Sequence, residues 1–459
     1  MSMMAEVGCL LMKFQLNIIN TIMNQQKSYR SSFILLTILF FLWGFITVLV
    51  DSLIPRLREL FTLTYFQAGL VQFAFFGAYF LLSVPASYIL SKIGYKKGII
   101  LGLLTMALGC LLFYPAASYR VFGIFMLAYF ILAAGITVLQ VAANPFVAVL
   151  GSEEGASSRL NLSQAFNSLG TAIAPAVGAL FILSDRIKTK DEIAALTGAA
   201  KDNYLTTEAS AVQTPFLGLA LFIVFIAGIF LFAKLPKMIS DENTGSYSEA
   251  FKNKNLMLGV LGIFFYVGAE VAIGSYLVNY FLDMNLVTVI KGNSLMKSIA
   301  ESILNSGITE SDNKAIVGVF VTFYWSGAMI GRFIGAYLTK IMKPGNVLGI
   351  FATIAMILIL ISISSTGLLS MWSILAVGLF NSIMFPTIFA LAINGIGSLK
   401  PKASGLLCMA IVGGAIIPPF FGLLTDYVGF KIALIFIMVC YGYILWYGIK
   451  NSKKNLLDA

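Results

Sequence analysis

Twelve apolar runs of roughly 20 residues recur along this chain, and that length is what an α-helix needs to cross a bilayer. The chain has 459 residues, of which 59% are hydrophobic and only 11% are charged. A soluble domain has about a quarter of its residues charged. We therefore predict an all-α integral membrane protein with twelve transmembrane helices. The predicted spans are residues 33–55, 65–90, 98–115, 121–150, 158–183, 214–235, 256–282, 315–342, 346–364, 368–395, 403–424 and 430–449.

The spans fall into two sets of six on either side of a polar stretch. Weak internal repeats place corresponding segments six spans apart. Leu90–Ile93 is similar to Leu338–Ile341, and Gly170–Pro175 is similar to Gly413–Pro418. Two six-helix halves related by pseudo-symmetry are therefore expected, with a substrate held between them. The predicted parts are an N-terminal tail (1–30), a first half (31–235), a central loop (236–254), a second half (255–450) and a C-terminal tail (451–459).

The basic residues predict the orientation in the membrane. An even number of spans places both termini on one side. Most of the 30 lysines and arginines then lie in segments that face the cytoplasm if the termini do. Among them, Lys92, Lys96 and Lys97 between the second and third spans are candidates for a gating or a purely structural role. Because these basic loops explain the net charge of +10, we do not expect nucleic acid as a partner. We expect a lipid bilayer as partner and a monomeric protein.

Amide side chains on the fourth and fifth spans are the first candidates for a binding site. Gln140 and Asn144 share one helix face, and Gln164 and Asn167 share another. Amides inside a membrane are costly unless they bind each other across helices or line a wet cavity. Four of them at similar depths favour a cavity suited to a neutral, polyhydroxylated solute. Further candidates, some able to stack on a sugar ring, are Trp43, Gln72, Asn279, Tyr324, Trp325, Asn381 and Asn394.

Three charged residues lie well inside predicted spans: Asp51, Glu270 and Arg332. A charge at such a depth costs a few kcal/mol, so a functional role is the first expectation and an internal ion pair is the alternative. For Arg332, snorkelling, a structural salt bridge and ligand contact all remain open. The chain has no histidine and no phosphate-binding loop, and its four cysteines lack metal-ligand spacing. We expect neither an enzyme nor a bound cofactor.

The segment Ser87–Lys97 resembles a degraded form of the loop motif that the major facilitator superfamily carries between spans two and three. That motif begins with Gly and places an Asp before the basic residue, where this chain has Ser87 and Ser91. The resemblance implies the twelve-helix major facilitator fold. The departure implies that the usual carboxylate contact at the inner gate is absent.

A closer resemblance is to the fucose permease family, and within it to bacterial glucose/galactose transporters. The residues that carry it are Phe41–Asp51, Gln67–Tyr79, Ala142–Phe146, Leu160–Gly170, Tyr266–Glu270 and Gly331–Gly335. The resemblance implies sugar uptake across the bacterial inner membrane, coupled to protons or sodium. Glucose or galactose is the expected substrate, and a fucose or N-acetylglucosamine proton symporter is the alternative. From other classes, a membrane sugar sensor and a multidrug exporter are weaker alternatives, because the tails are short and the amides are many.

The coupling ion is left open by one departure from the fucose pattern. Asp51 matches the first-span carboxylate that the family needs for transport. The second carboxylate of fucose permease, on the fourth span, is replaced here by Gln140, and Glu270 appears on the seventh span instead. A carboxylate can either be protonated or bind a hard cation such as Na⁺. The resemblance therefore implies Asp51 and Glu270 as the ion-coupling residues, with Na⁺ or H⁺ as the coupling cation.

Overall fold

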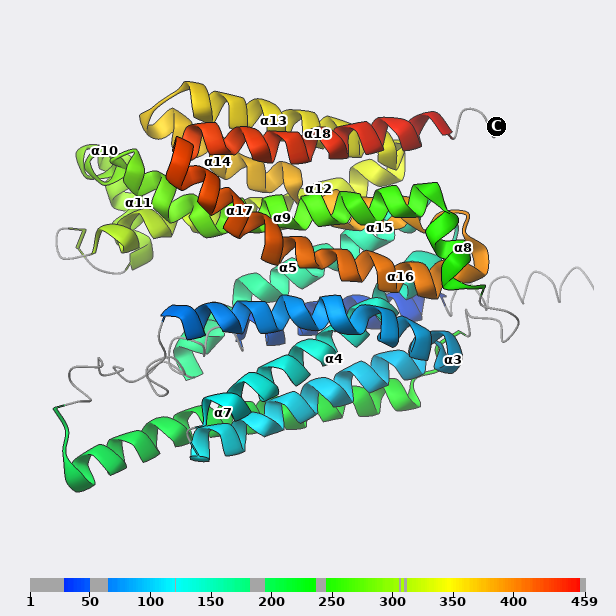
Figure 1. Cartoon of the computed structure of the whole chain (residues 1–459), viewed down its shortest axis with the longest axis horizontal. Helices are drawn as coiled ribbons and strands as arrows, with labels where there is room; N and C mark the ends of the chain where they lie inside the picture. The colour runs from blue at the N-terminus through cyan, green and yellow to red at the C-terminus, as the bar shows by residue number, and fades with distance from the viewer. Residues whose placement is uncertain are drawn as a thin grey trace, which may run out of the picture.

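The structure is a computed structural model that describes residues 29–49, 65–119, 121–181, 195–236, 245–304, 307–308 and 312–454. Every regular element in these ranges is a helix, as predicted (Figure 1). The long helices of the first half are Tyr29–Leu49, α3 (Tyr65–Tyr119), α4 (Phe122–Val149), α5 (Ala156–Phe181) and α7 (Gly198–Phe232). The helices of the second half that correspond to predicted spans are α9 (Lys254–Asp283), α12 (Asn313–Ile341), α13 (Pro344–Ser364), α14 (Gly367–Asn381), α15 (Met384–Ala392), α16 (Lys400–Met409), α17 (Gly413–Val428) and α18 (Phe430–Lys454).

The described ranges contain ten segments long and apolar enough to cross a membrane. One of them, α3, combines the second and third predicted spans, which meet at a bend at Gly94 (φ 80°). The fifth predicted span is α5, which is not among the ten. Together these helices account for the twelve predicted spans, so the predicted fold class is confirmed.

Helices also occur where the sequence predicted only loops. α7 begins at Gly198, well before the predicted start of the sixth span at residue 214. The part of α7 that precedes residue 214 is rich in alanine, a strong helix former. Two short helices, α10 (Leu286–Gly292) and α11 (Ser294–Leu304), follow α9. A third, α8 (Tyr247–Lys252), lies in the central loop, where the Ser246 side chain accepts a hydrogen bond from the Glu249 backbone and caps its first turn.

The predicted tenth and eleventh spans are broken helices rather than continuous ones. Ser382 and Ile383 separate α14 from α15, and a short 3₁₀ turn, Ala410–Val412, separates α16 from α17. Pro386 explains the first break, because proline has no N–H to donate to the carbonyl four residues earlier and its ring crowds that carbonyl. The carbonyl concerned is that of Ser382, which is therefore available to another partner.

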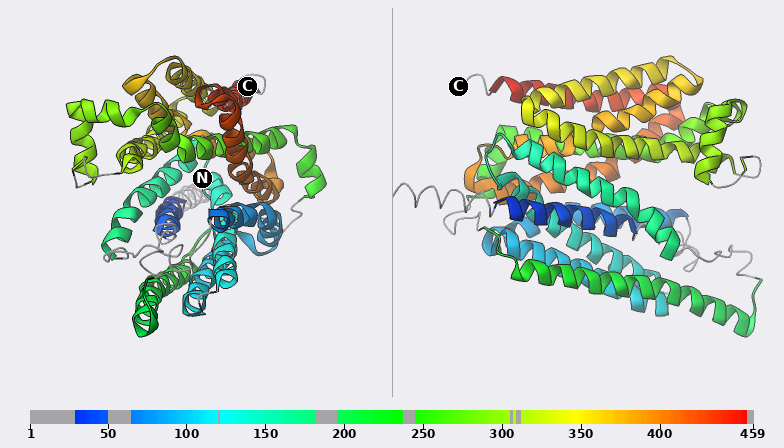
Figure 2. Two further views of the ribbon diagram at one scale, coloured as in Figure 1. Left: turned by 60° about the vertical axis from the view of Figure 1, so that its left-hand side comes forward. Right: turned by 180° about the vertical axis from the view of Figure 1, so that it is seen from behind.

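The helices form two groups that pack along one interface (Figures 1 and 2). α5 of the first half packs against α12 and α15, and α16 of the second half packs against α3 and α4. The internal repeat has a counterpart in this packing. The repeated glycines lie against the backbone of the first helix of their own half, Gly170 on Phe41 and Gly413 on Phe264. A side chain at either position would overlap that backbone, so both fix a close helix crossing.

Candidate functional site

A cavity of about 600 Å³ lies between the two halves, and each half contributes six lining residues. The lining carries hydroxyls, one amide, one indole, one carboxylate and one guanidinium. A volume of this size is typical of small-molecule sites, and its place between the halves is the one expected from the repeat. The lining residues are Val48, Asn167, Ser168, Thr171, Ala172, Pro175, Glu270, Thr322, Trp325, Ser326, Ala328 and Arg332.

Arg332 holds the two halves together at this cavity. Its Nε donates to the Ser382 carbonyl at 3.2 Å, which is free because of Pro386. Its Nη1 donates to the Gln164 carbonyl at 3.4 Å and to the Ser168 hydroxyl, both on α5. Within the described ranges no carboxylate lies close enough to Arg332 to form an ion pair. For Arg332 the sequence left snorkelling, a structural salt bridge and ligand contact open. In the structure its guanidinium forms hydrogen bonds between the halves, and the residue lines the cavity.

The neighbouring Gly331 makes this contact possible. A Cβ at Gly331 would overlap the Leu379 carbonyl and the Ser382 hydroxyl, so only glycine lets α12 approach α14 closely enough there. Close helix approach at a residue without a side chain is common in membrane proteins. The local sequence Gly331–Arg332 therefore sets both the helix crossing and the aim of the guanidinium.

Glu270 on α9 also lines the cavity, and its side chain is incompletely paired. Its Oε1 is buried and makes no hydrogen bond of normal geometry among the described residues. The Tyr266 hydroxyl, one turn earlier, is buried in the same way and lies near enough to the carboxylate to interact with it. An unpaired buried carboxylate oxygen is costly as an anion, and protonation or a bound cation removes that cost. The arrangement suits a group that exchanges a proton or a cation.

Two predicted substrate residues lie behind Glu270 rather than in the cavity wall. Asn381 donates from Nδ2 to the Tyr324 hydroxyl at 2.6 Å and to that of Tyr441 at 3.3 Å. The Tyr324 hydroxyl in turn donates to the Glu270 carbonyl at 3.4 Å. Both Asn381 and Tyr324 are fully buried and neither lines the cavity. Their hydrogen bonds hold α9, α12 and α14 in register around the carboxylate.

The four amides on which the sequence argument rested have different surroundings. Asn167 lines the cavity, and its Nδ2 donates to the Phe40 carbonyl at 2.9 Å. Gln164 donates to Asn144 at 3.4 Å, and Gln140 donates to the Tyr79 hydroxyl at 2.5 Å. These last three link helices within the first half and are not among the lining residues, so their part in binding stays a prediction.

Three further predicted site residues lie either away from the cavity lining or outside the described residues. Trp43 is buried and packs edge-on against Phe40, with ring centroids 5.3 Å apart, away from the cavity lining. Asp51 and the side chain of Gln72 lie outside the described residues. Ser168, Thr171 and Ser326 also line the cavity but were not predicted as site residues. Helical spacing could have indicated Thr171, which follows Asn167 by four residues on the same face of α5. Ser326 is six residues from Arg332 and so is not on the same face of α12, and spacing alone gave no signal for it.

Contacts between the halves cluster at the end of the bundle away from the cavity. On α5 they involve the first turns: Ser158 donates to the Ala336 carbonyl at 2.6 Å, and Asn161 donates to the Thr387 hydroxyl at 3.0 Å. The cavity residues of α5 lie later, from Asn167 to Pro175. Apart from the contacts of Arg332 at the cavity, the hydrogen bonds that α5 makes to the second half thus lie in its early turns, at the end of the helix away from the cavity.

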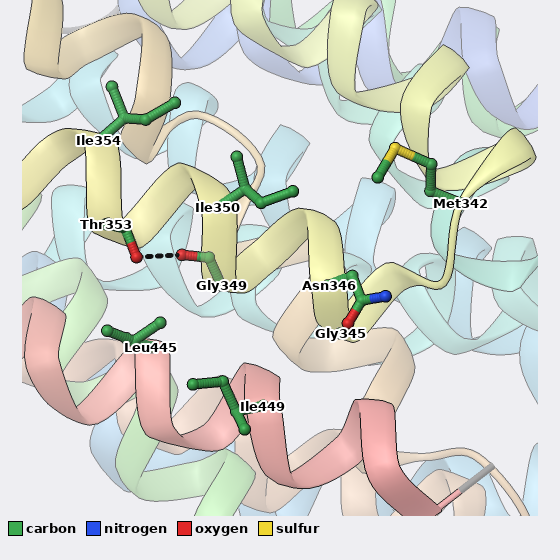
Figure 3. Close-up of a pocket in the computed structure, with 9 residues that line it drawn as sticks. All are labelled: Met342, Gly345, Asn346, Gly349, Ile350, Thr353, Ile354, Leu445 and Ile449. Atoms are coloured by element: carbon green, nitrogen blue, oxygen red, sulfur yellow. Dashed lines mark hydrogen bonds between the residues drawn. The ribbon is translucent and has the colours of Figure 1, made fainter. Parts of the chain in front are cut away.

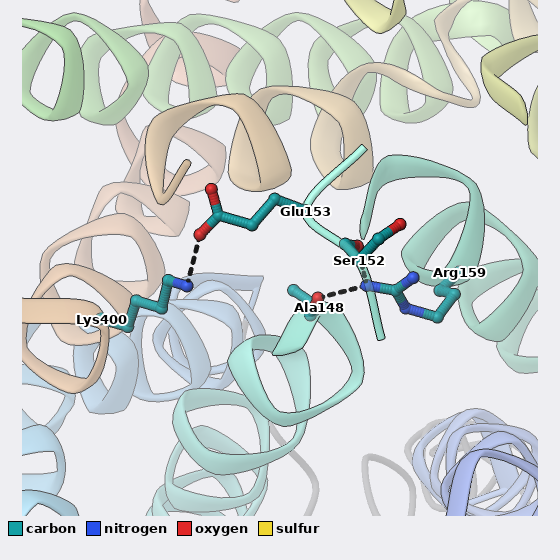
Figure 4. Close-up of polar contacts among 5 residues, drawn as sticks. All are labelled: Ala148, Ser152, Glu153, Arg159 and Lys400. Atoms are coloured by element: carbon teal, nitrogen blue, oxygen red, sulfur yellow. Dashed lines mark hydrogen bonds and ion pairs between the residues drawn. The ribbon is translucent and has the colours of Figure 1, made fainter. Parts of the chain in front are cut away.

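An ion pair completes this closed end (Figure 4). Lys400 Nζ on α16 lies 2.9 Å from Glu153 Oε1 in the connection between α4 and α5. That connection is held by Arg159, which donates to the Ala148 carbonyl at 2.6 Å and the Ser152 carbonyl at 2.7 Å. Arg159 thus positions the loop that presents Glu153 to the other half.

The lysines predicted as gating candidates contact only the first half. Lys96 donates to the carbonyls of Leu231 and Ala233, each at 2.8 Å, and Lys92 lies over the Tyr88 ring, 4.4 Å from its centroid. Lys97 is exposed. Among the described residues, these partners of Lys92 and Lys96 all belong to the first half, which favours a structural role, and the gating role stays a prediction.

The central-loop helix α8 contacts α3 at Ser87, the position at which the loop motif begins. The Tyr247 hydroxyl hydrogen-bonds Ser87 and donates to the Val84 carbonyl at 2.9 Å, while Lys402 of α16 donates to the Gly245 carbonyl. Burial raises the pKa of the Tyr247 phenol, so it remains protonated and able to donate. The central loop thereby joins α3 to α16 through hydrogen bonds, one of which is donated by the charged Lys402 ammonium.

A second groove lies on the second half alone (Figure 3). It runs between α13 and α18 and is lined by residues that include Gly345, Thr353, Leu445 and Ile449. The Thr353 hydroxyl donates to the Gly349 carbonyl of its own helix at 2.9 Å. The groove does not lie between the halves and carries no charged lining residue, so the first cavity is the better candidate site.

Comparison with known proteins agrees with this architecture. The chain is 46% identical over 444 residues to a glucose/galactose transporter of Brucella abortus, covering 95% of this chain and 98% of that protein. It is 36% identical over 414 residues to the L-fucose–proton symporter of Escherichia coli, covering 88% of this chain and 89% of that protein. The solved structure of the transporter FucP in its outward conformation matches with a TM-score of 0.82 and 33% identity, covering 93% of this chain and 99% of that one. The model of the Major Facilitator Superfamily matches residues 36–410. The chain therefore belongs to the major facilitator superfamily.

Proposed function

We propose that this protein imports a neutral monosaccharide, glucose or galactose, by alternating access, coupled to Na⁺ or H⁺. Like other members of its superfamily it is a multi-pass membrane transporter and not an enzyme. The observation that carries the proposal is the cavity between the halves, which offers hydroxyls, an amide and an indole to a solute. The glucose/galactose transporters among its relatives, at 46% and 43% identity, favour these sugars over fucose.

The charges in the cavity fit a neutral substrate. The lining carries one carboxylate, that of Glu270, and one guanidinium, that of Arg332, so it has no excess of charged residues of either sign that would favour an ionic substrate. Sugar hydroxyls can both donate and accept, and they would pair with the Asn167 amide and the Ser168 and Thr171 hydroxyls. An exporter of apolar compounds would need a more apolar lining.

We further propose that the structure is the outward-open state of a monomer in a bacterial inner membrane, with both termini in the cytoplasm. The clustering of contacts between the halves at one end of the bundle supports a state open at the other end. The similarity to FucP in its outward conformation supports the same direction. In this orientation Lys400–Glu153 and α8 belong to the cytoplasmic gate.

Coupling is proposed to run through Glu270 together with Asp51. The support is the buried Oε1 of Glu270, which makes no hydrogen bond of normal geometry among the described residues and lies beside a cavity that both halves line. If the sugar binds only when this carboxylate is protonated or holds Na⁺, movement of the sugar is coupled to movement of the cation. Such coupling is reciprocal, so the sugar affects binding of the cation by the same factor. The relatives named as L-fucose–proton symporters make H⁺ one candidate, and the loss of the fourth-span carboxylate at Gln140 keeps Na⁺ the other.

The test is counterflow in proteoliposomes loaded with unlabelled sugar. Labelled glucose and galactose should accumulate transiently, while fucose and N-acetylglucosamine should not. Imposed separately, either a Na⁺ or a proton gradient should then drive uphill uptake. Counterflow of fucose alone would reassign the substrate, and no counterflow of any of the four sugars would refute sugar transport.

A further inference from the structure

Trp325 on α12 is a partly exposed aromatic residue in the wall of the cavity. It remains 48% exposed, and it lines the cavity between the halves. Its indole makes a T-shaped contact with the Tyr324 ring, at 5.1 Å between centroids and 84° between planes. The exposed surface of the ring is therefore available to whatever enters the cavity.

The other side of the indole rests on a residue that has no side chain. A Cβ built at Gly274 of α9 would come within 2.7 Å of Cζ2 and 3.3 Å of Cη2 of Trp325. The six-membered ring thus lies directly against the α9 backbone, where any other residue would push it away. Gly274 follows Glu270 by four residues, so the indole and the carboxylate are neighbours on one face of α9.

We propose that Trp325 is the stacking wall of the sugar site and that Gly274 is the residue that positions it. This inference rests on the proposed sugar transport. An indole can pack on the C–H face of a pyranose ring while hydroxyls at the rim of the ring bind polar groups. The polar groups here are Asn167, Ser168 and Thr171 across the cavity, with Glu270 one turn away along α9. The site therefore selects cyclic pyranoses that present such a face.

The first measurement is the equilibrium affinity of the purified protein for labelled glucose or galactose. Trp325→Ala should weaken binding by roughly tenfold, the size expected for loss of one aromatic contact, and Trp325→Phe should retain most of it. Gly274→Ala should weaken binding by a similar factor because the indole is displaced. In the Trp325→Ala background, Gly274→Ala should have no further effect, since the two act through one contact.

A spectroscopic readout separates stacking from a purely structural role. The chain has four tryptophans, so replacing Trp43, Trp372 and Trp446 by Phe leaves Trp325 as the only emitter. Sugar should shift its emission to shorter wavelength and protect it from acrylamide, and Gly274→Ala should abolish both effects. Gly318→Ala is the matched control on α12, because its Cβ would meet nothing closer than 3.9 Å.

The outcomes distinguish this inference from the proposed function. If wild-type protein performs counterflow but Trp325→Ala binds sugar with unchanged affinity, the stacking wall is refuted and transport stands. The same holds if sugar leaves the Trp325 emission unchanged, or if Gly274→Ala weakens binding equally with and without Trp325. If wild-type protein neither binds nor exchanges any sugar, the proposed function itself fails.

Discussion

The ion pair between Lys400 and Glu153 should bias the protein toward the state described here. It joins the two halves at their closed end, and Lys400→Glu replaces attraction by repulsion without touching the cavity. Two unit charges 2.9 Å apart in a water-like medium attract by about 1.4 kcal/mol. The side chains are 18% and 52% exposed, so solvent and salt reduce the value of the pair to about 0.5–1 kcal/mol.

Charge reversal turns that attraction into a repulsion of similar size, a total of about 1–2 kcal/mol. The equilibrium between the two states should then shift roughly five- to thirtyfold toward the alternative state, in which the end that carries Lys400 and Glu153 is open. A tenfold shift would turn a population that is nine-tenths in the present state into one that is about half in it. The double variant Glu153→Lys with Lys400→Glu restores the pair and should restore the population.

The assay is the labelling rate of a reporter cysteine in the cavity. Thr171→Cys lines the cavity and is made in a Cys9→Ser background, and the other three native cysteines, Cys110, Cys408 and Cys440, are buried thiols that should react slowly. With a membrane-impermeant maleimide added outside intact cells, Lys400→Glu should roughly halve the initial rate, and the double variant should recover it. Equal rates in all three proteins would refute a gating role for the pair. As a control, Lys297→Glu breaks a pair within α11 and should change nothing.

Three further predictions follow from the cavity and its supports. Glu270→Gln should abolish uphill accumulation of sugar while preserving downhill exchange, measured by uptake with and without ion gradients; retained accumulation would exclude Glu270 from coupling. Asn167→Ala should weaken sugar binding roughly tenfold, through loss of one hydrogen bond of about 1–3 kcal/mol, whereas Gln164→Ala should weaken it less, because Gln164 is paired with Asn144 and is not among the lining residues; the reverse order in a binding assay would move the site. Gly331→Ala should destabilise the protein by about 1–3 kcal/mol in thermal unfolding, because its Cβ would overlap α14, and Gly318→Ala should not; equal melting would contradict the close crossing.

The sequence by itself determined the fold class and singled out two charged residues that line the cavity. Runs long enough to span a bilayer can satisfy their backbone only as helices, so the spans followed from length and hydropathy alone. Glu270 and Arg332 stood out because a charge inside such a run is costly, and both indeed line the cavity. Pro386 already signalled the break after α14 through its missing N–H, although the span was read as continuous.

Only the tertiary structure decided which polar side chains reach the cavity. Helical spacing places Gln140 with Asn144 and Gln164 with Asn167, but it does not say which neighbour each face meets. The packing of the first half turned Gln140 toward Tyr79 and joined Gln164 to Asn144, leaving Asn167 as the cavity amide. Likewise, Trp325 owes its place to Gly274 on another helix, and Glu153 meets Lys400 more than 200 residues away. These contacts depend on the rotation and crossing of helices remote in sequence, which close packing sets and local patterns do not encode.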